Sequence, residues 1–118
     1  MARSMAAGRV VEIDDEPTIA EGLAGQIDEA GLEIGRNALD EIVTLGEEEI
    51  GGAIGWLWRE HGARVEGAGA AGTAAVLHRT IASLPTPAAV IVSGGNIDAT
   101  RFEQLLARVE RDALSVMR

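Results

Sequence analysis

The chain has 118 residues, a net charge of −9, an apolar fraction of 47% and no cysteine. This length fits one domain or part of one, the acidic charge argues against nucleic acid as a partner, and the lack of cysteine excludes disulfides and thiolate metal sites. No apolar run reaches the ~20 residues that cross a bilayer and no signal peptide is recognisable, so we expect a cytoplasmic protein without membrane contact.

All ten basic residues are arginines, so the chain contains no lysine. Chemistry that needs a lysine amine, above all Schiff-base formation, therefore cannot be completed by these residues alone. The sequence also lacks a recognisable nucleophile, base and orienting group, and it lacks the spacing of a metal site. We assign no catalytic residue and no metal ligand to this chain.

The first third of the chain predicts short elements separated by polar turns. Residues 10–13 and 41–45 are rich in β-branched and apolar residues, as in strands. Residues 14–17 form an acidic turn, which could bind a hard cation but lacks the spaced pattern of a calcium loop. Residues 18–25 fit a loop or short helix with two glycines, and residues 32–39 fit a short helix.

A longer helix is predicted to run to about His61. Thr44 and Glu47 have the spacing of a capping box, and three successive glutamates would stabilise the positive end of the helix. Trp56 falls off the apolar face, which leaves open whether it marks a partner surface. Helical spacing predicts one buried face formed by Ile50, Ala53, Ile54, Leu57 and Trp58.

A third strand and a glycine-rich helix start come next. Residues 63–66 fit a short strand, and the Gly/Ala run at 67–72 opens a helix. This run could cradle an anion at the helix start or allow close packing. The predicted buried stripe of the helix consists of Ala70, Ala74, Leu77, Ile81 and Leu84.

The last part of the chain predicts a buried strand and a final helix. Residues 88–92 are a continuous apolar run, which is typical of a strand covered on both faces. Thr100 and Glu103 again have capping-box spacing. The apolar face of the final helix comprises Phe102, Leu105, Leu106 and Val109.

Helices and strands thus alternate with short connections. Such alternation favours parallel strands joined by right-handed crossovers. We therefore predict an α/β fold in three layers, with a small parallel sheet of about three to four strands flanked by helices.

Polar residues follow two of these strands where a parallel sheet binds its ligands. Glu66 and Ser93 each close a strand and precede glycines, and the loop around Gly22 could reach the same edge. A carboxylate, a hydroxyl and exposed backbone amides could hold a polar small molecule. A tight strand-to-helix turn without a ligand would use Gly94 and Gly95 equally well.

Four stretches together resemble one enzyme family. The sequence is similar to the C-terminal segment of the serine/threonine dehydratases, which are pyridoxal-phosphate enzymes of the tryptophan-synthase-β-like fold and include serine racemase. The resemblance covers essentially the whole chain. It rests on Ser93-Gly94-Gly95-Asn96-Ile97-Asp98, on Pro17-Thr18-Ile19-Ala20-Glu21-Gly22, on Ile42-Val43-Thr44-Leu45 with Glu47-Glu48-Glu49-Ile50, and on Val65-Glu66-Gly67-Ala68-Gly69 with Ala74-Ala75.

The resemblance implies a cofactor-binding role for five residues. Ser93 would hydrogen-bond the pyridine nitrogen of pyridoxal 5'-phosphate, and a neutral hydroxyl there would leave the ring largely unprotonated. Gly22 would lie against one face of the ring, and Glu66 would stand near its edge. Gly94 and Gly95 would keep the backbone clear of the ring.

The chain also departs from the family, because it lacks three of the family's motifs. The resemblance implies a Schiff-base lysine, a substrate-carboxylate loop and a phosphate loop, and none of these motifs is present. We therefore expect residues 1–118 to be an incomplete, C-terminal part of a dehydratase large domain. Its partner would be a missing N-terminal segment or a second copy, and its substrate threonine or serine. The alternative is a non-catalytic, self-associating module of the same fold.

Overall fold

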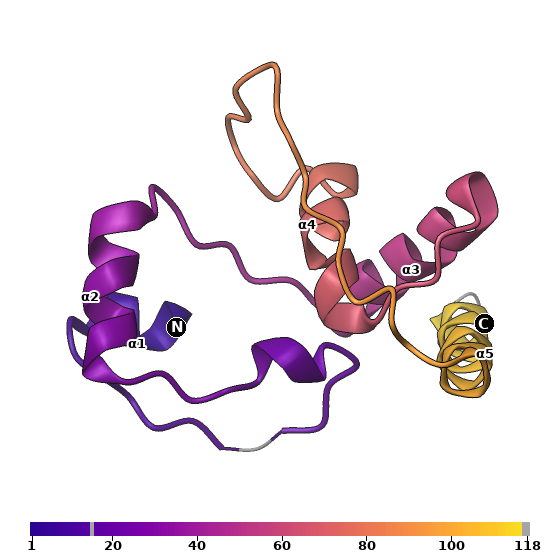
Figure 1. The fold of residues 1–118 in the computed structure, drawn as a ribbon, viewed down its shortest axis with the longest axis horizontal. Helices are drawn as coiled ribbons and strands as arrows, with labels where there is room; N and C mark the ends of the chain where they lie inside the picture. Colours follow the sequence, from indigo (N-terminus) through magenta and orange to yellow (C-terminus); the bar gives the residue numbers. More distant parts are fainter. Residues whose placement is uncertain (15, 117–118) are drawn as a thin grey trace.

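The computed structural model describes residues 1–14 and 16–116, which form five α-helices and one 3₁₀ turn (Figure 1). Asp15 of the predicted acidic turn lies outside the described residues. The elements are α1 (Ala2–Ala7), η1 (Glu21–Leu23), α2 (Glu29–Ala38), α3 (Glu47–His61), α4 (Gly67–Leu77) and α5 (Ala99–Val116).

The predicted α/β fold with a parallel sheet is wrong for this structure, because no strand forms within residues 1–14 and 16–116. Residues 41–45, 63–66 and 88–92 have no ladder of hydrogen bonds. One backbone hydrogen bond runs from the Glu66 N–H, at the end of the second segment, to the Gly94 carbonyl, two residues after the third segment (3.3 Å). An apolar run predicts burial, but a strand also needs a neighbour at ladder distance, and Ile91 is 85% exposed.

Helices α1 and α2 form a small pair at one side of the molecule, joined to the rest by extended chain (Figure 1). Leu32 of α2 is fully buried, and the Ser4 hydroxyl of α1 accepts a hydrogen bond from the Val11 N–H (3.0 Å). Helix α2 begins three residues before its predicted start because Asp28 caps it, accepting from the Gly31 N–H (2.7 Å). Helix α1 has no recognisable sequence pattern and was not predicted.

Helix α3 is the centre of the core and packs against both α4 and α5. Its N-cap is Gly46 rather than Thr44, since the Gly46 N–H donates to Glu49 (2.7 Å). Four of the five predicted core residues are buried: Ile50, Ala53, Ile54 and Leu57.

The two tryptophans of α3 differ from the prediction, which placed Trp58 on the buried face and Trp56 off it. Trp58 is 39% exposed, while Trp56 is half-buried against His61, with ring centroids 4.9 Å apart. Trp58 keeps one edge-to-face contact with Phe102 of α5 (5.3 Å). It is exposed because the turn of α5 that reaches it covers only part of its ring.

Helices α4 and α5 complete this cluster. Helix α4 ends at Leu77, so Ile81 and Leu84 of the predicted stripe lie beyond the helix. Helix α5 begins after Asp98, whose carboxylate accepts from the Arg101 N–H (2.8 Å), so the predicted capping box at Thr100 is wrong. Phe102 is the buried anchor of α5, at 2% exposure.

Two backbone segments cross the first turn of α4. A Cβ placed on Gly67 would stand 2.0 Å from the Ile19 carbonyl oxygen, and one on Gly69 would stand 2.0 Å from the Ser93 carbonyl oxygen. Neither distance is possible for a side chain, so the chain requires glycine at both positions. Of the two interpretations left open for this glycine run, the structure supports close packing, since carbonyl oxygens already line it.

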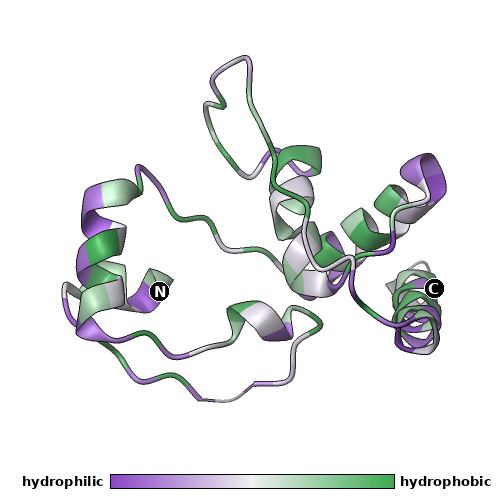
Figure 2. Ribbon diagram, viewed as in Figure 1, coloured by the Kyte–Doolittle hydropathy of each residue, from purple (hydrophilic) through white to green (hydrophobic). Residues whose placement is uncertain are grey.

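The chain is more open than a compact domain of the same length. Its radius of gyration is 15.3 Å, against about 13.5 Å for a compact domain of this length. Its accessible surface is 8336 Å², against about 6,100 Å² for a folded monomer of 12.3 kDa. The excess is roughly 2,200 Å². Residues 78–98, between α4 and α5, form a segment that projects from the helices, and Figure 2 shows apolar residues along it.

No helix in the part of the chain that the structure describes is long and apolar enough to cross a bilayer.

Replacing Phe102 by alanine should detach α5 from α3. We expect a loss of about 3 to 5 kcal/mol in the free energy of unfolding, because a buried ring is removed. Leu114→Ala is the matched control on the same helix, since Leu114 is 63% exposed; its effect should stay within about 0.5 kcal/mol. Urea denaturation followed by circular dichroism measures the free energy of unfolding of both variants, and equal losses would contradict the packing of Phe102 against α3.

Replacing Gly69 by alanine should force the Ser93 segment away from α4. We expect destabilisation of about 2 kcal/mol or more, as in overpacked cores. Gly52→Ala in α3 is the control, because a Cβ there would meet only the His78 ring at an ordinary 3.8 Å. That substitution should stabilise the helix by about 0.5 to 1 kcal/mol. Denaturant titration measures the change in the free energy of unfolding for both variants. A Gly69→Ala variant as stable as Gly52→Ala would contradict the close approach of Ser93.

Candidate functional site

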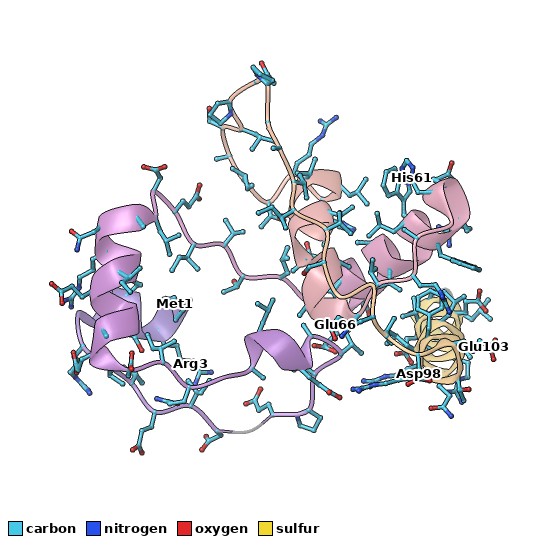
Figure 3. The ribbon with its side chains drawn as sticks, viewed as in Figure 1. Met1, Arg3, His61, Glu66, Asp98 and Glu103 are labelled. Atoms are coloured by element: carbon cyan, nitrogen blue, oxygen red, sulfur yellow. The ribbon has the colours of Figure 1, made fainter. Side chains whose placement is uncertain are left out.

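Three of the predicted site residues meet at the start of α4, where Glu66 faces η1 (Figure 3). A Cβ on Gly22 would stand 3.0 Å from the Ala68 Cβ and 3.9 Å from Glu66 Oε1. A Cβ on Gly94 would stand 2.2 Å from the Glu66 Cγ. Gly22 and Gly94, which are 72 residues apart in the sequence, therefore both lie against the Glu66 side chain.

The Gly94 turn directs the chain back toward α4. Gly94 has φ +72°, in the left-handed region, and its carbonyl accepts from the N–H groups of Glu66 (3.3 Å) and Ile97 (3.4 Å). Ser93, directly before it, is exposed, while its carbonyl packs on Gly69. The hydroxyl of Ser93 thus belongs to the surface and not to the interior of the core.

Gly95 lies next to this group rather than in it. Its nearest neighbour, measured from the position of a Cβ, is the Arg64 carbonyl oxygen at 3.7 Å. The structure therefore brings Gly22, Glu66 and Gly94 into contact, with Ser93 adjoining them in the chain. Neither Gly22 nor Glu66 lies as close to the Cβ position of Gly95 as the Arg64 carbonyl oxygen does.

The loop that carries Gly22 is held by residues that sequence reasoning missed. Glu47 of α3 accepts hydrogen bonds from the Thr18 hydroxyl and from the Ile19 N–H (2.9 Å). Glu21 forms an ion pair with Arg101 of α5 (2.6 Å), with both side chains largely exposed. The sequence pattern indicated a local role for Glu47, in a capping box with Thr44 and as a helix-start charge. No local pattern shows a partner 29 residues away.

A cavity of about 90 Å³ opens beside these residues, lined by Gly22, Glu66, Ile97 and Arg101 among others. Sites that enclose a small molecule usually have volumes of about 300 to 1,000 Å³. This cavity is therefore too small to enclose a small molecule. Across residues 1–14 and 16–116, no group of three or more histidines and carboxylates is placed to hold a metal ion.

These residues offer groups for binding rather than for catalysis. Glu66 supplies a carboxylate, and Ser93, exposed and directly before Gly94, supplies a hydroxyl. The Cβ positions of Gly22 and Gly94 are occupied by Ala68 and Glu66, so these glycines allow segments of the chain to pack closely. None of these groups is paired with a base that could activate a nucleophile.

Comparison with known proteins gives a consistent result. Residues 1–94 match the family model described as pyridoxal-phosphate dependent enzyme. The chain is 35% identical over 107 residues to an L-threonine ammonia-lyase of Thermotoga maritima, a match that covers 90% of this chain and 26% of that protein. It is 32% identical over 102 residues to a serine racemase of Arabidopsis thaliana, covering 82% of this chain and 31% of that protein.

The structural comparison agrees with the sequence matches. The crystal structure of a T.th. threonine deaminase superposes with a TM-score of 0.72 at 37% identity, covering 81% of this chain and 35% of that chain. The chain thus spans about a quarter to a third of the length of the proteins it matches. Since the family model covers most of the residues, the chain belongs to the pyridoxal-phosphate dependent enzyme family.

Proposed function

We propose that residues 1–118 form the C-terminal part of the large domain of a cytoplasmic, pyridoxal-phosphate-dependent threonine/serine ammonia-lyase. In that enzyme the segment supplies one wall of the cofactor site. The observation that carries the proposal is the meeting of Gly22, Glu66 and Gly94 at the start of α4, in a chain that matches threonine ammonia-lyases over 90% of its length.

In this proposal each residue of the wall has a separate task. The Ser93 hydroxyl hydrogen-bonds the ring nitrogen, and Gly22 lies under one face of the ring. Glu66 stands at the ring edge, while Gly94 and Gly95 keep the main chain clear. The proposal is supported by the contact of Gly22 and Gly94 with the Glu66 side chain, which brings three of the five residues together.

Pyridoxal phosphate, when bound, acts as an electron sink, which is the chemistry needed to convert threonine or serine into a 2-oxo acid and ammonia. The role of this chain is to bind and orient the ring. A neutral hydroxyl at Ser93 does not supply the proton that a carboxylic acid would. Because the chain has no lysine, the amine that anchors the cofactor comes from outside these 118 residues.

We further propose that the rest of the enzyme covers the projecting segment between α4 and α5. Val90, Ile91 and Val92 are 40%, 85% and 44% exposed, although all three are β-branched and apolar. The roughly 2,200 Å² of excess surface is ample for a stable interface. A second copy of this chain is the competing occupant, and it corresponds to a non-catalytic, self-associating module.

Replacing Ser93 by alanine should weaken cofactor binding. We expect the Kd for pyridoxal phosphate to rise roughly fivefold in the full-length polypeptide that carries these residues, because one hydrogen bond to the ring is lost. Ser83→Ala is the matched control, since Ser83 is also an exposed serine outside any helix. Fluorescence titration measures both, and equal affinities would remove Ser93 from the site.

Replacing Ile91 by glutamate should block association without unfolding the helices. The helical circular dichroism should stay unchanged, because the Ile91 side chain is mostly exposed in this chain, whereas binding of the remaining part of the enzyme should weaken at least roughly 10-fold. Ile34→Glu on α2, at 66% exposure, is the control and should leave binding unaffected. If sedimentation instead shows a homodimer that Ile91→Glu dissociates, a second copy of this chain covers the segment, and the alternative of a self-associating module is correct.

A further inference from the structure

The segment immediately before Gly22 is fixed from one side by a single carboxylate. Glu47 accepts from the Ile19 N–H (2.9 Å) through one oxygen and from the Thr18 hydroxyl through the other. The Thr18 oxygen in turn accepts from the Ala20 N–H (3.1 Å). Both oxygens of Glu47 are therefore used on residues 18–20, and the charge strengthens each bond.

The opposite side of the same segment rests on α4. The Ile19 carbonyl oxygen occupies the space where a side chain of Gly67 would lie, 2.0 Å from the Cβ position, and Ala20 is buried. Residues 18–20 are thus confined between the first turns of α3 and α4. Gly22 follows Ala20 by two residues, so the confinement of residues 18–20 decides where Gly22 lies.

We propose that Glu47 is a positioning residue of the cofactor site, holding residues 18–20 so that Gly22 stays against Ala68 and beside Glu66. The inference rests on the proposed function, in which Gly22 lies under the cofactor ring. Glu47 would act through the loop and would not itself touch the ring.

Two comparisons within the chain support this assignment. Glu48 also lies in the first turn of α3 and has the same favourable interaction with the helix dipole, yet it accepts no hydrogen bond from the residues that the structure describes. The Glu21–Arg101 ion pair also reaches the loop, and its partners are exposed, as Glu47 is. It joins two side chains, whereas Glu47 accepts from the main-chain N–H of Ile19 and so holds the backbone of the loop directly.

Amide hydrogen exchange tests the contact directly in the full-length polypeptide. In Glu47→Ala the Ile19 amide should exchange roughly 10-fold faster, because its charged acceptor is gone. Glu47→Gln keeps one acceptor oxygen and should lie between that variant and the wild type. Glu48→Ala should match the wild type, and the Ile54 amide in α3 serves as the reference for global unfolding. Equal Ile19 exchange in the Glu47→Ala and Glu48→Ala variants would overturn the proposal.

Pyridoxal phosphate titration then tests the link to the cofactor. The Kd should rise at least roughly threefold in Glu47→Ala, recover in part in Glu47→Gln and remain unchanged in Glu48→Ala. Faster Ile19 exchange with an unchanged Kd would refute the positioning role. If the wild-type polypeptide fails to bind the cofactor at all, the proposed function fails together with that role, while the exchange data still decide whether Glu47 holds the loop.

Discussion

At the first turn of α4, two backbone segments approach the helix more closely than any side chain would allow. The Ile19 and Ser93 carbonyls sit where the Cβ atoms of Gly67 and Gly69 would be. This close approach brings the Gly22 loop and the Gly94 turn to the same place, where both lie against Glu66. The candidate site exists because α4 begins with glycines, and the core formed by α3, α4 and α5 holds that helix in position.

The residues that meet there are two glycines and the Glu66 carboxylate, with the exposed Ser93 directly before Gly94. The chain has no lysine, and the cavity of about 90 Å³ beside these residues is smaller than an ordinary ligand site. Family membership, the fraction of the relatives that the chain spans and the excess exposed surface agree with one another. They support the proposal that this segment works together with further protein surface.

The failed expectations have two causes, a missing partner segment and a competing cap. Residues 88–92 have the composition of a buried strand, but they pair with no other strand in the described residues, and Val90 instead lies against Gly72 of α4 while Ile91 is exposed. Thr44 and Thr100 have capping spacing, yet Gly46 and Asp98 occupy the cap positions. Trp58 lies on the predicted apolar face, but α5 covers it only in part.

The sequence by itself determined the features that depend on neighbours along the chain. These are the helical periodicity of α3 and α5, the positions of the glycines and the family to which the motifs belong. Only the tertiary structure decided which segments touch. Glu47 accepts from residues 18 and 19, Gly22 and Gly94 both meet Glu66, and the apolar segment at 88–92 stays partly exposed. The physical reason is that helix formation and turns are set by local spacing and backbone conformation, whereas burial and strand pairing require a partner that a linear pattern does not name.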